Sequence, residues 1–318
     1  MRALPLFLLL GGGWLAQAAH AAEPQDWLKR IAQAEQQQNF QGTFVYERSG
    51  SFSTHQVWHR VDAGQVRERL QQLDGPAQEV VRVDGRTQCV SGALADQMGG
   101  QLWPARDLDA AQIAKSYEIS VVGESRVAGR PAVVLSLVPR DQHRYGFELH
   151  LDRETGLPLK SLMLNDKGGL LERFQFTQLE TVRPDDAELQ PGADCQSVSF
   201  SEAPAEQASG WRSDWLPPGF SLSSSTQRRS PASSDTVACL LYGDGLARFS
   251  VFLEPLHGAR VEDIVPYELG PTVAVSRRLS TADGDVMVTV VGEIPVGTAE
   301  RVALSMRSAG TAGSPAPQ

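Results

Sequence analysis

The sequence lacks the motifs that most often mark catalysis. It has no G-x-S-x-G elbow, no P-loop, and no G-x-G-x-x-G after a strand. His55 and His59 fall in a predicted strand, where four residues span about 13 Å, so the two cannot reach one zinc ion. His143 and His150 lie seven residues apart in another predicted strand, and no cysteine or carboxylate cluster completes a metal site with them. We therefore predict no enzyme and no catalytic, cofactor-binding or metal-binding residues, and expect the histidines to be surface or packing residues.

Cysteine is scarce: the chain has three, Cys89, Cys195 and Cys239. An oxidising compartment permits one disulfide among them and leaves one thiol over. Their spacing is far too wide for a C-x-x-C redox or zinc motif. The sequence leaves all three pairings open.

Long apolar runs are missing after the N-terminus. Arg2, the apolar run from Leu4 to Leu10 and the small residues that follow are typical of a secretory signal, and Ala19-His20-Ala21 fits its cleavage rule. We therefore predict a signal peptide over residues 1–21. The run is shorter than the roughly 20 residues of a spanning helix, and no cysteine follows for lipid attachment. An exported, soluble mature chain in the periplasm is expected.

Basic side chains are in deficit. Loss of Arg2 with the signal lowers the 29 basic side chains to 28, against 38 acidic ones, a net charge of −10. An acidic chain is a poor generic ligand of nucleic acids or anionic membranes. We expect no nucleic-acid partner.

The mature chain is long enough for two domains. Trp27, Leu28, Ile31 and Ala34 recur at helical spacing near its start. Short alternating strands are predicted within 42–83 and 117–180, with a helix at 107–116 between them. So many strands must curl, because twist accumulates. The pattern predicts a mainly β fold with some α, in which residues 22–195 form one curled antiparallel sheet covered by helices.

The second half is predicted to be smaller. Residues 196–210 surround Pro204 with Ser, Glu, Ala and Gln, which is typical of a linker. After it the pattern predicts a helix at 297–306 and four strands, at 237–242, 246–253, 272–279 and 285–293. We predict a small α+β domain over 211–308 and a disordered tail over 309–318.

Large apolar side chains alternate with polar ones on three strands of the first domain. Alternation places such residues on one face of a sheet. Many strands with little helical cover could leave a groove for acyl chains, whereas the alternative is an ordinary core under the helices. The candidate lipid groove comprises Phe44, Tyr46, Tyr145, Phe147, Leu149, Phe174 and Phe176.

Long motifs in both halves resemble the RseB/MucB family. The second half carries WLPPGF at 215–220, YGDGLARFSV at 242–251 and VGEIPVGTAER at 291–301, and the first carries FQGTFVY at 40–46 and RDQHRYGFELHLD at 140–152. The resemblance covers nearly the whole mature chain. In the partner-binding domain it rests on Trp215, Pro217, Gly219, Phe220, Tyr242, Asp244, Gly245 and Phe249.

The resemblance implies a negative regulator of an envelope-stress sigma factor. Family members bind the periplasmic part of a MucA/RseA-like transmembrane anti-sigma factor and protect it from regulated proteolysis. Lipid or lipopolysaccharide fragments in the N-terminal barrel are thought to release it, and in one branch the output includes alginate production. Such release requires that the lipid bind the partner-free form better, and the linker at 196–210 supplies a hinge.

The resemblance also implies that residues 22–195 form an unclosed antiparallel β-barrel like those of periplasmic lipoprotein carriers. A periplasmic lipid or lipoprotein carrier is therefore the alternative. The second domain weighs against it, because a carrier needs only the barrel. The oligomeric state, a homodimer included, and the identity of the lipid stay open.

Overall fold

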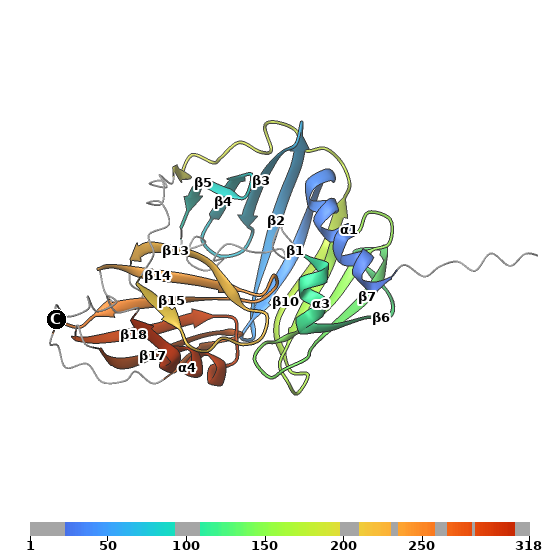
Figure 1. Ribbon diagram of the computed structural model, residues 1–318. Helices are drawn as coiled ribbons and strands as arrows, with labels where there is room; N and C mark the ends of the chain where they lie inside the picture. Colours follow the sequence, from blue (N-terminus) through green and yellow to red (C-terminus); the bar gives the residue numbers. More distant parts are fainter. Residues whose placement is uncertain are drawn as a thin grey trace, which may run out of the picture.

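The chain forms two antiparallel β-sheets, one large and one small, which Figure 1 shows side by side. The structure is a computed structural model that describes residues 23–92, 109–197, 210–229, 235–257, 266–281 and 284–308. The predicted signal peptide and tail, and most of the predicted linker, lie outside the described residues. Among the described helices, none is long and apolar enough to cross a membrane.

The first sheet has eleven strands in the order β11-β5-β4-β3-β2-β1-β10-β9-β8-β7-β6. β1 pairs with both β2 and β10, so two successive runs of strands join in the middle of the sheet. The two outermost strands, β6 and β11, do not pair with each other. The strands are β1 (Phe40–Arg48), β2 (Ser51–Asp62), β3 (Gln65–Gln72), β4 (Gln78–Val83), β5 (Arg86–Ser91), β6 (Tyr117–Val127), β7 (Arg130–Pro139), β8 (Gly146–Asp152), β9 (Pro158–Leu164), β10 (Leu170–Glu180) and β11 (Gln196–Ser197).

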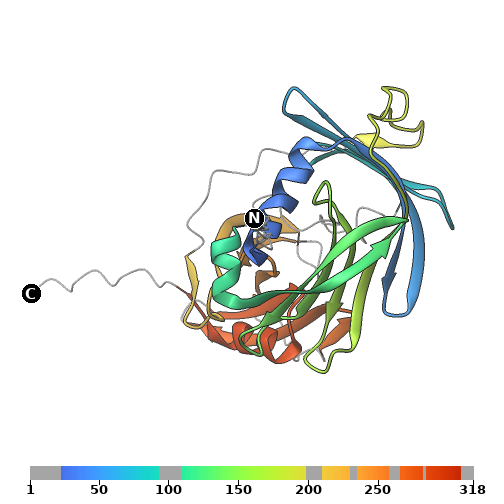
Figure 2. The ribbon, with the colours of Figure 1, turned by 90° about the vertical axis from the view of Figure 1, so that its right-hand side faces the viewer.

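Two helices pack on the inner face of this curled sheet, as Figure 2 shows. They are α1 (Pro24–Gln37) and α3 (Ala110–Ser116). Ile31 of α1 and Ile113 of α3 are fully buried against the sheet residue Leu135. The Asp109 side chain caps α3 by accepting hydrogen bonds from the first-turn amides. The unclosed barrel covered by helices is thereby confirmed.

The turns follow the predicted chemistry. Asp84 and Gly85, between β4 and β5, both have positive φ, at 49° and 74°. A two-residue hairpin turn of the primed type needs this backbone at both central positions, which Asp-Gly tolerates well. The Asp84-Gly85 dipeptide therefore suits the turn that it forms.

The second sheet has six strands in the order β13-β14-β15-β18-β17-β16, with α4 (Val296–Ser305) packed against β17 and β18. Its strands are β13 (Ser221–Arg229), β14 (Thr236–Gly243), β15 (Arg248–Pro255), β16 (Tyr267–Leu269), β17 (Thr272–Thr281) and β18 (Gly284–Gly292). The short strands β12 (Trp211–Ser213) and β19 (Met306–Ser308) pair separately. The smaller α+β unit is confirmed.

Six strands escaped the sequence pattern, and three of them, β5, β13 and β16, pair directly with a predicted strand. β13 contains a single large apolar residue, Leu222, which is half exposed, so no alternation marks it. β16 is three residues long and fully exposed. β5 was not predicted either, because Cys89 is its one buried residue. All three are formed by pairing with a neighbouring strand rather than by burial of a face of their own.

A disulfide joins Cys89 of β5 to Cys195, which precedes β11. The two Cα atoms are 5.5 Å apart and 106 residues apart in sequence. Of the three pairings that the sequence left open, the structure selects this one. Cys239, in β14, keeps a buried thiol.

We expect one thiol per chain in denaturant without reductant, and three after reduction. Native protein should react slowly, because Cys239 is only 2% exposed. A thiol reagent that absorbs on reaction measures both the counts and the rates. Three thiols in unreduced protein of verified monomer mass would contradict the Cys89–Cys195 disulfide.

Candidate functional site

Three phenylalanines of the predicted groove form one aromatic cluster. Phe44 of β1 lies across from Phe176 of β10, and the ring centroids of Phe44 and Phe174 are 4.8 Å apart. Phe174 and Phe176 meet edge to face at 5.2 Å. All three side chains are at most 3% exposed. They share a hydrophobic core with Ala34 of α1, so the helix and the sheet together cover the rings.

The remaining groove residues lie elsewhere. Leu149 and Phe147, both of β8, belong to a second core beneath α3, where Phe147 packs beside Tyr117. The Tyr46 hydroxyl donates a 2.7 Å hydrogen bond to the Glu172 carboxylate. Burial, together with the nearby charges of Glu268 and Glu293, raises the pKa of Tyr145 to about 12. The seven residues are therefore divided between two cores and the boundary with the second domain.

Two histidines extend the phenylalanine cluster. The His55 ring stacks on Phe44 at 5.1 Å, and the His59 ring stacks on Phe40 at 4.6 Å. Burial lowers the pKa of His55 to about 4, so its ring is neutral near pH 7. His59 lies 2.9 Å from the Glu35 carbonyl oxygen through Nε2 and 3.0 Å from Glu68 through Nδ1. For these two histidines the predicted packing role is confirmed.

The partner-binding motif of the second domain lies against the first domain. Arg144, in the segment between β7 and β8, forms an ion pair with Asp244, and both side chains are fully buried. The same guanidinium donates a 2.5 Å hydrogen bond to the Pro218 carbonyl and a 2.9 Å one to Asp141. It also lies 5.0 Å from the Phe220 ring centroid. We call this ion pair with its neighbours the Arg144 clamp.

The glycines of the motif allow this close approach. A Cβ on Gly219 would lie 2.4 Å from Ser116 Oγ, and Gly219 has φ +84°. Gly245 has φ +97° and faces Ile113 of α3. Either position is strained for any residue with a side chain. Pro217 completes the turn, since its carbonyl accepts the amide of Phe220.

The other motif residues support the contact from behind. The Trp215 ring meets His143 edge to face at 5.1 Å, and Arg301 covers Trp215 at 3.8 Å. Tyr242 and Phe249 stack at 5.1 Å inside the second core. The motif therefore builds the domain interface and the core beneath it.

A second polar contact crosses the interface. Arg48, at the end of β1, hydrogen-bonds Thr272 of β17 and lies 3.3 Å from the Glu293 carboxylate. Its Nε is 3.9 Å from Glu172 in its own domain. Sequence reasoning missed Arg48, Arg144 and Glu293 as interface residues. The available signal was that Arg144 and Glu293 fall inside the long family motifs.

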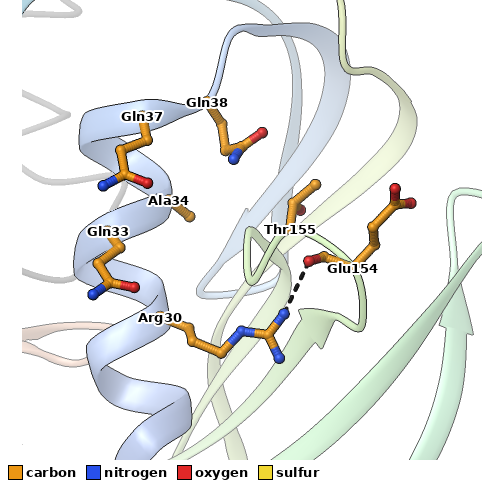
Figure 3. A pocket seen from close by; sticks show the side chains of 7 residues that line it. All are labelled: Arg30, Gln33, Ala34, Gln37, Gln38, Glu154 and Thr155. Atoms are coloured by element: carbon orange, nitrogen blue, oxygen red, sulfur yellow. Dashed lines mark hydrogen bonds between the residues drawn. The ribbon is translucent and has the colours of Figure 1, made fainter.

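One polar pocket of about 290 Å³ lies between α1 and the turn after β8 (Figure 3). Its lining carries glutamine amides, one threonine and the Arg30 guanidinium, which donates a 2.9 Å hydrogen bond to the Glu154 carbonyl. Nothing in it is arranged for acyl chains. The lining residues are Arg30, Gln33, Ala34, Gln37, Gln38, Glu154 and Thr155.

One group of metal-ligating residues occurs in the part of the chain that the structure describes: Glu79, Cys89 and Cys195. Both sulfurs are in the disulfide, and Glu79 forms an ion pair with Arg69 at 3.0 Å. A disulfide sulfur is not the thiolate that zinc requires. This group is therefore not a metal centre in the oxidised protein.

Asp244→Asn should lower the free energy of unfolding by about 3 kcal/mol, because it removes the fully buried counter-charge of Arg144 and leaves the guanidinium with Asp141, which is 20% exposed. Asparagine keeps the oxygen that accepts the Leu246 and Ala247 amides, so the loss reports the charge. Denaturant unfolding measures it. The control is Glu124→Gln, which breaks an exposed ion pair with Arg153 and should cost under about 1 kcal/mol. Equal losses of unfolding free energy in the two variants would contradict the larger contribution expected of the Arg144 clamp.

Known proteins match this chain along its length. The family model of the MucB/RseB N-terminal domain matches residues 23–195, and that of the MucB/RseB C-terminal domain matches residues 205–307. The chain is 66% identical to Sigma factor AlgU regulatory protein MucB of Pseudomonas aeruginosa over 310 residues, 96% of this chain and 98% of the relative.

Solved structures agree. A complex of Pseudomonas aeruginosa MucA and MucB, 66% identical, superposes with a TM-score of 0.80 over 91% of this chain and 100% of that chain. A crystal structure of MucB, 63% identical, superposes with a TM-score of 0.69 over 91% of this chain and 99% of that chain. From the two domain models and the near full-length identity, we conclude that the chain belongs to the MucB/RseB family.

Proposed function

We propose that this chain is a periplasmic regulator that binds the periplasmic segment of a MucA/RseA-like transmembrane anti-sigma factor. The observation that carries the proposal is the superposition of both domains on the MucB chain of the MucA/MucB complex, at 66% identity. The 66% identity to the MucB relative covers 96% of this chain, so both domains take part in the match. A binding surface shared by both domains needs them held in one arrangement, which two buried polar contacts do here.

Bound in this way, the chain acts by covering its partner. It protects the anti-sigma segment from the first protease of a regulated cascade, and an envelope-stress sigma factor stays inactive. Control of AlgU, and through it of alginate production, is the output suggested by the MucB relative. The proposed action is binding alone, without a catalytic step.

Lipid or lipopolysaccharide fragments release the partner in this proposal. The inner face of the unclosed barrel supplies apolar surface, with Phe44, Phe174 and Phe176 at its centre. The three rings are at most 3% exposed. An acyl chain can reach them only if α1 moves away or if the outermost strands, β6 and β11, move apart. Entry that moves a covering element would couple lipid binding to the surface that holds the partner.

A lipid or lipoprotein carrier is the second candidate, favoured by the unclosed barrel. A carrier has no use for a second domain joined to the barrel by a fully buried ion pair. Affinity capture from solubilised membranes distinguishes the two: a regulator retains a transmembrane anti-sigma factor, and a carrier retains lipoproteins.

The mature chain should bind a MucA-like periplasmic segment with sub-micromolar affinity, about −8 kcal/mol or better. It should also slow cleavage of that segment by the site-one protease. Titration calorimetry and a timed cleavage assay measure the two effects. Undiminished cleavage at saturating protein would rule the protective role out, and the same segment in scrambled order is the control.

Phe147→Asp should prevent lipid from releasing the partner, because a charge on the apolar face opposes acyl insertion. An acyl chain gains about 0.8 kcal/mol per buried CH₂, so even half a chain could supply the 1–3 kcal/mol that coupling typically needs. Partner binding without lipid should persist. Release is measured by the anti-sigma segment that lipid displaces.

The matched control is Phe52→Asp on β2, where the phenylalanine is 64% exposed. Each variant must first show a native-like melting curve, since Phe147 packs beside Tyr117 in the second core. If lipid displaces the partner from folded Phe147→Asp and Phe52→Asp alike, the face around Phe147 is core and not the lipid sensor.

A further inference from the structure

Two carboxylates from different domains meet at one guanidinium. Glu172, on β10 of the first domain, lies 3.9 Å from Arg48 Nε, and Glu293, after β18 of the second domain, lies 3.3 Å from Arg48 Nη2. Arg48 and Glu172 are each about one-fifth exposed. We call Glu172 and Glu293 the acid pair. Its two members are close only while the domains are in contact.

The surroundings leave the acid pair short of positive charge. Arg48 from β1 faces both carboxylates, and Arg248 from β15 faces Glu293 alone. Tyr46, also on β1, donates its hydroxyl to Glu172. The Tyr145 hydroxyl is close enough to Glu293 to feel its charge, and it also feels the charges of Glu268 of β16 and Asp166 after β9.

This environment favours a proton on the pair. Burial, followed by the charge of Glu293, raises the pKa of Glu172 to about 7, against the opposing effects of Tyr46 and Arg48. Burial also raises the pKa of Glu293, against Arg48 and Arg248. Carboxylates that share a site resist joint ionisation, so the acid pair takes up a proton more readily than a lone carboxyl does.

We propose that contact between the two domains takes up a proton on the acid pair, so that mild acid favours the closed arrangement. In the closed arrangement Arg48 reaches Thr272 and Glu293, and Arg144 reaches Asp244. Separation of the domains removes Glu293, which is 44% exposed while they are in contact, from Glu172 and brings the Glu172 carboxylate into water. The proton then leaves, because an exposed glutamate has an ordinary pKa of about 4.3.

The direction of the pH dependence follows from the linkage between proton binding and domain closing. A carboxyl whose pKa is higher in the closed arrangement stabilises that arrangement below its open-state pKa, and this stabilisation is lost as pH rises through about 7. Between these limits the closing equilibrium falls by at most about tenfold per pH unit for one proton. The two solved structures differ in their TM-scores against this chain, which are 0.80 for the MucA/MucB complex and 0.69 for MucB.

The proposal needs no partner and is tested on the mature chain alone. Dyes on cysteines introduced at the exposed positions Val122 and Leu304, one in each domain, report the closed fraction by energy transfer. Asp244→Asn serves as the background, because weakening the Arg144 clamp brings the equilibrium into a measurable range. We expect the closing equilibrium to fall at least fivefold from pH 6 to pH 8.

Glu172→Gln imitates the protonated carboxyl and should remove this pH dependence, holding the chain at its acid level. Glu180→Gln, an exposed carboxylate eight residues along the same strand, is the matched control and should leave the dependence intact. His143→Gln is run beside it, since His143 also crosses the interface to Thr298. An unchanged pH slope in Glu172→Gln would overturn the proposal.

A titration of the Glu172 side-chain carboxyl by ¹³C NMR in the otherwise unmodified chain keeps the test independent of the Asp244→Asn background. We expect a midpoint near neutrality, which Glu293→Gln lowers by removing the neighbouring charge. A midpoint near 4.3 in the unmodified chain would overturn the proposal, whatever the outcome of the partner-binding experiments.

Discussion

The ion pair between Arg144 and Asp244 is the contact on which the arrangement of this molecule depends. It has no exposure to water on either side, and its members come from different domains, 100 residues apart. A buried pair of this kind adds little to stability compared with an apolar contact, but an unpaired buried charge is costly. The two domains must therefore meet in an arrangement that brings Arg144 and Asp244 together. The surrounding groups, Asp141 and the Pro218 carbonyl, complete the hydrogen bonds that the guanidinium requires.

Helix α3 carries this constraint into the first domain. Its Ile113 faces Gly245, its Ser116 faces Gly219, and Leu246 packs on the same core as Ile113. That core continues into β7 and β8, where Leu135 and Leu149 lie. The inner face of the barrel and the second domain thus share one continuous apolar cluster, through which a change at either end can reach the other.

The sequence predicted the two-sheet architecture well, because apolar alternation and turn dipeptides are local properties. Strands such as β1, β8 and β10 follow directly from them. The candidate groove was harder, because alternation tells which side of a strand a residue faces but not which core lies on that side of a curled sheet. Phe44 and Phe147 therefore fall in different cores.

The interface was out of reach for the same kind of reason. Arg144 and Asp244 are each ordinary charged residues in sequence, and only the fold shows that they meet. The glycines beside them looked like turn residues, and Gly219 does sit in a turn. Its lack of a side chain, however, is required by Ser116 of the other domain. A residue in a family motif of one domain can in this way be required by the surface of the other domain.

The disulfide at Cys89 and Cys195 has a consequence for how readily the domains meet again after they part. It fixes the end of the first domain to β5, so the tether to the second domain begins at Ser197, the last residue of β11, and ends near Gly210. A stretch of about 14 residues spans at most about 50 Å when fully extended. Short tethers of this kind hold a departed domain at an effective concentration on the order of millimolar. Without the disulfide, β11 could separate from β5 at the edge of the sheet. The tether would then be longer, and the effective concentration of the second domain at the first would be lower.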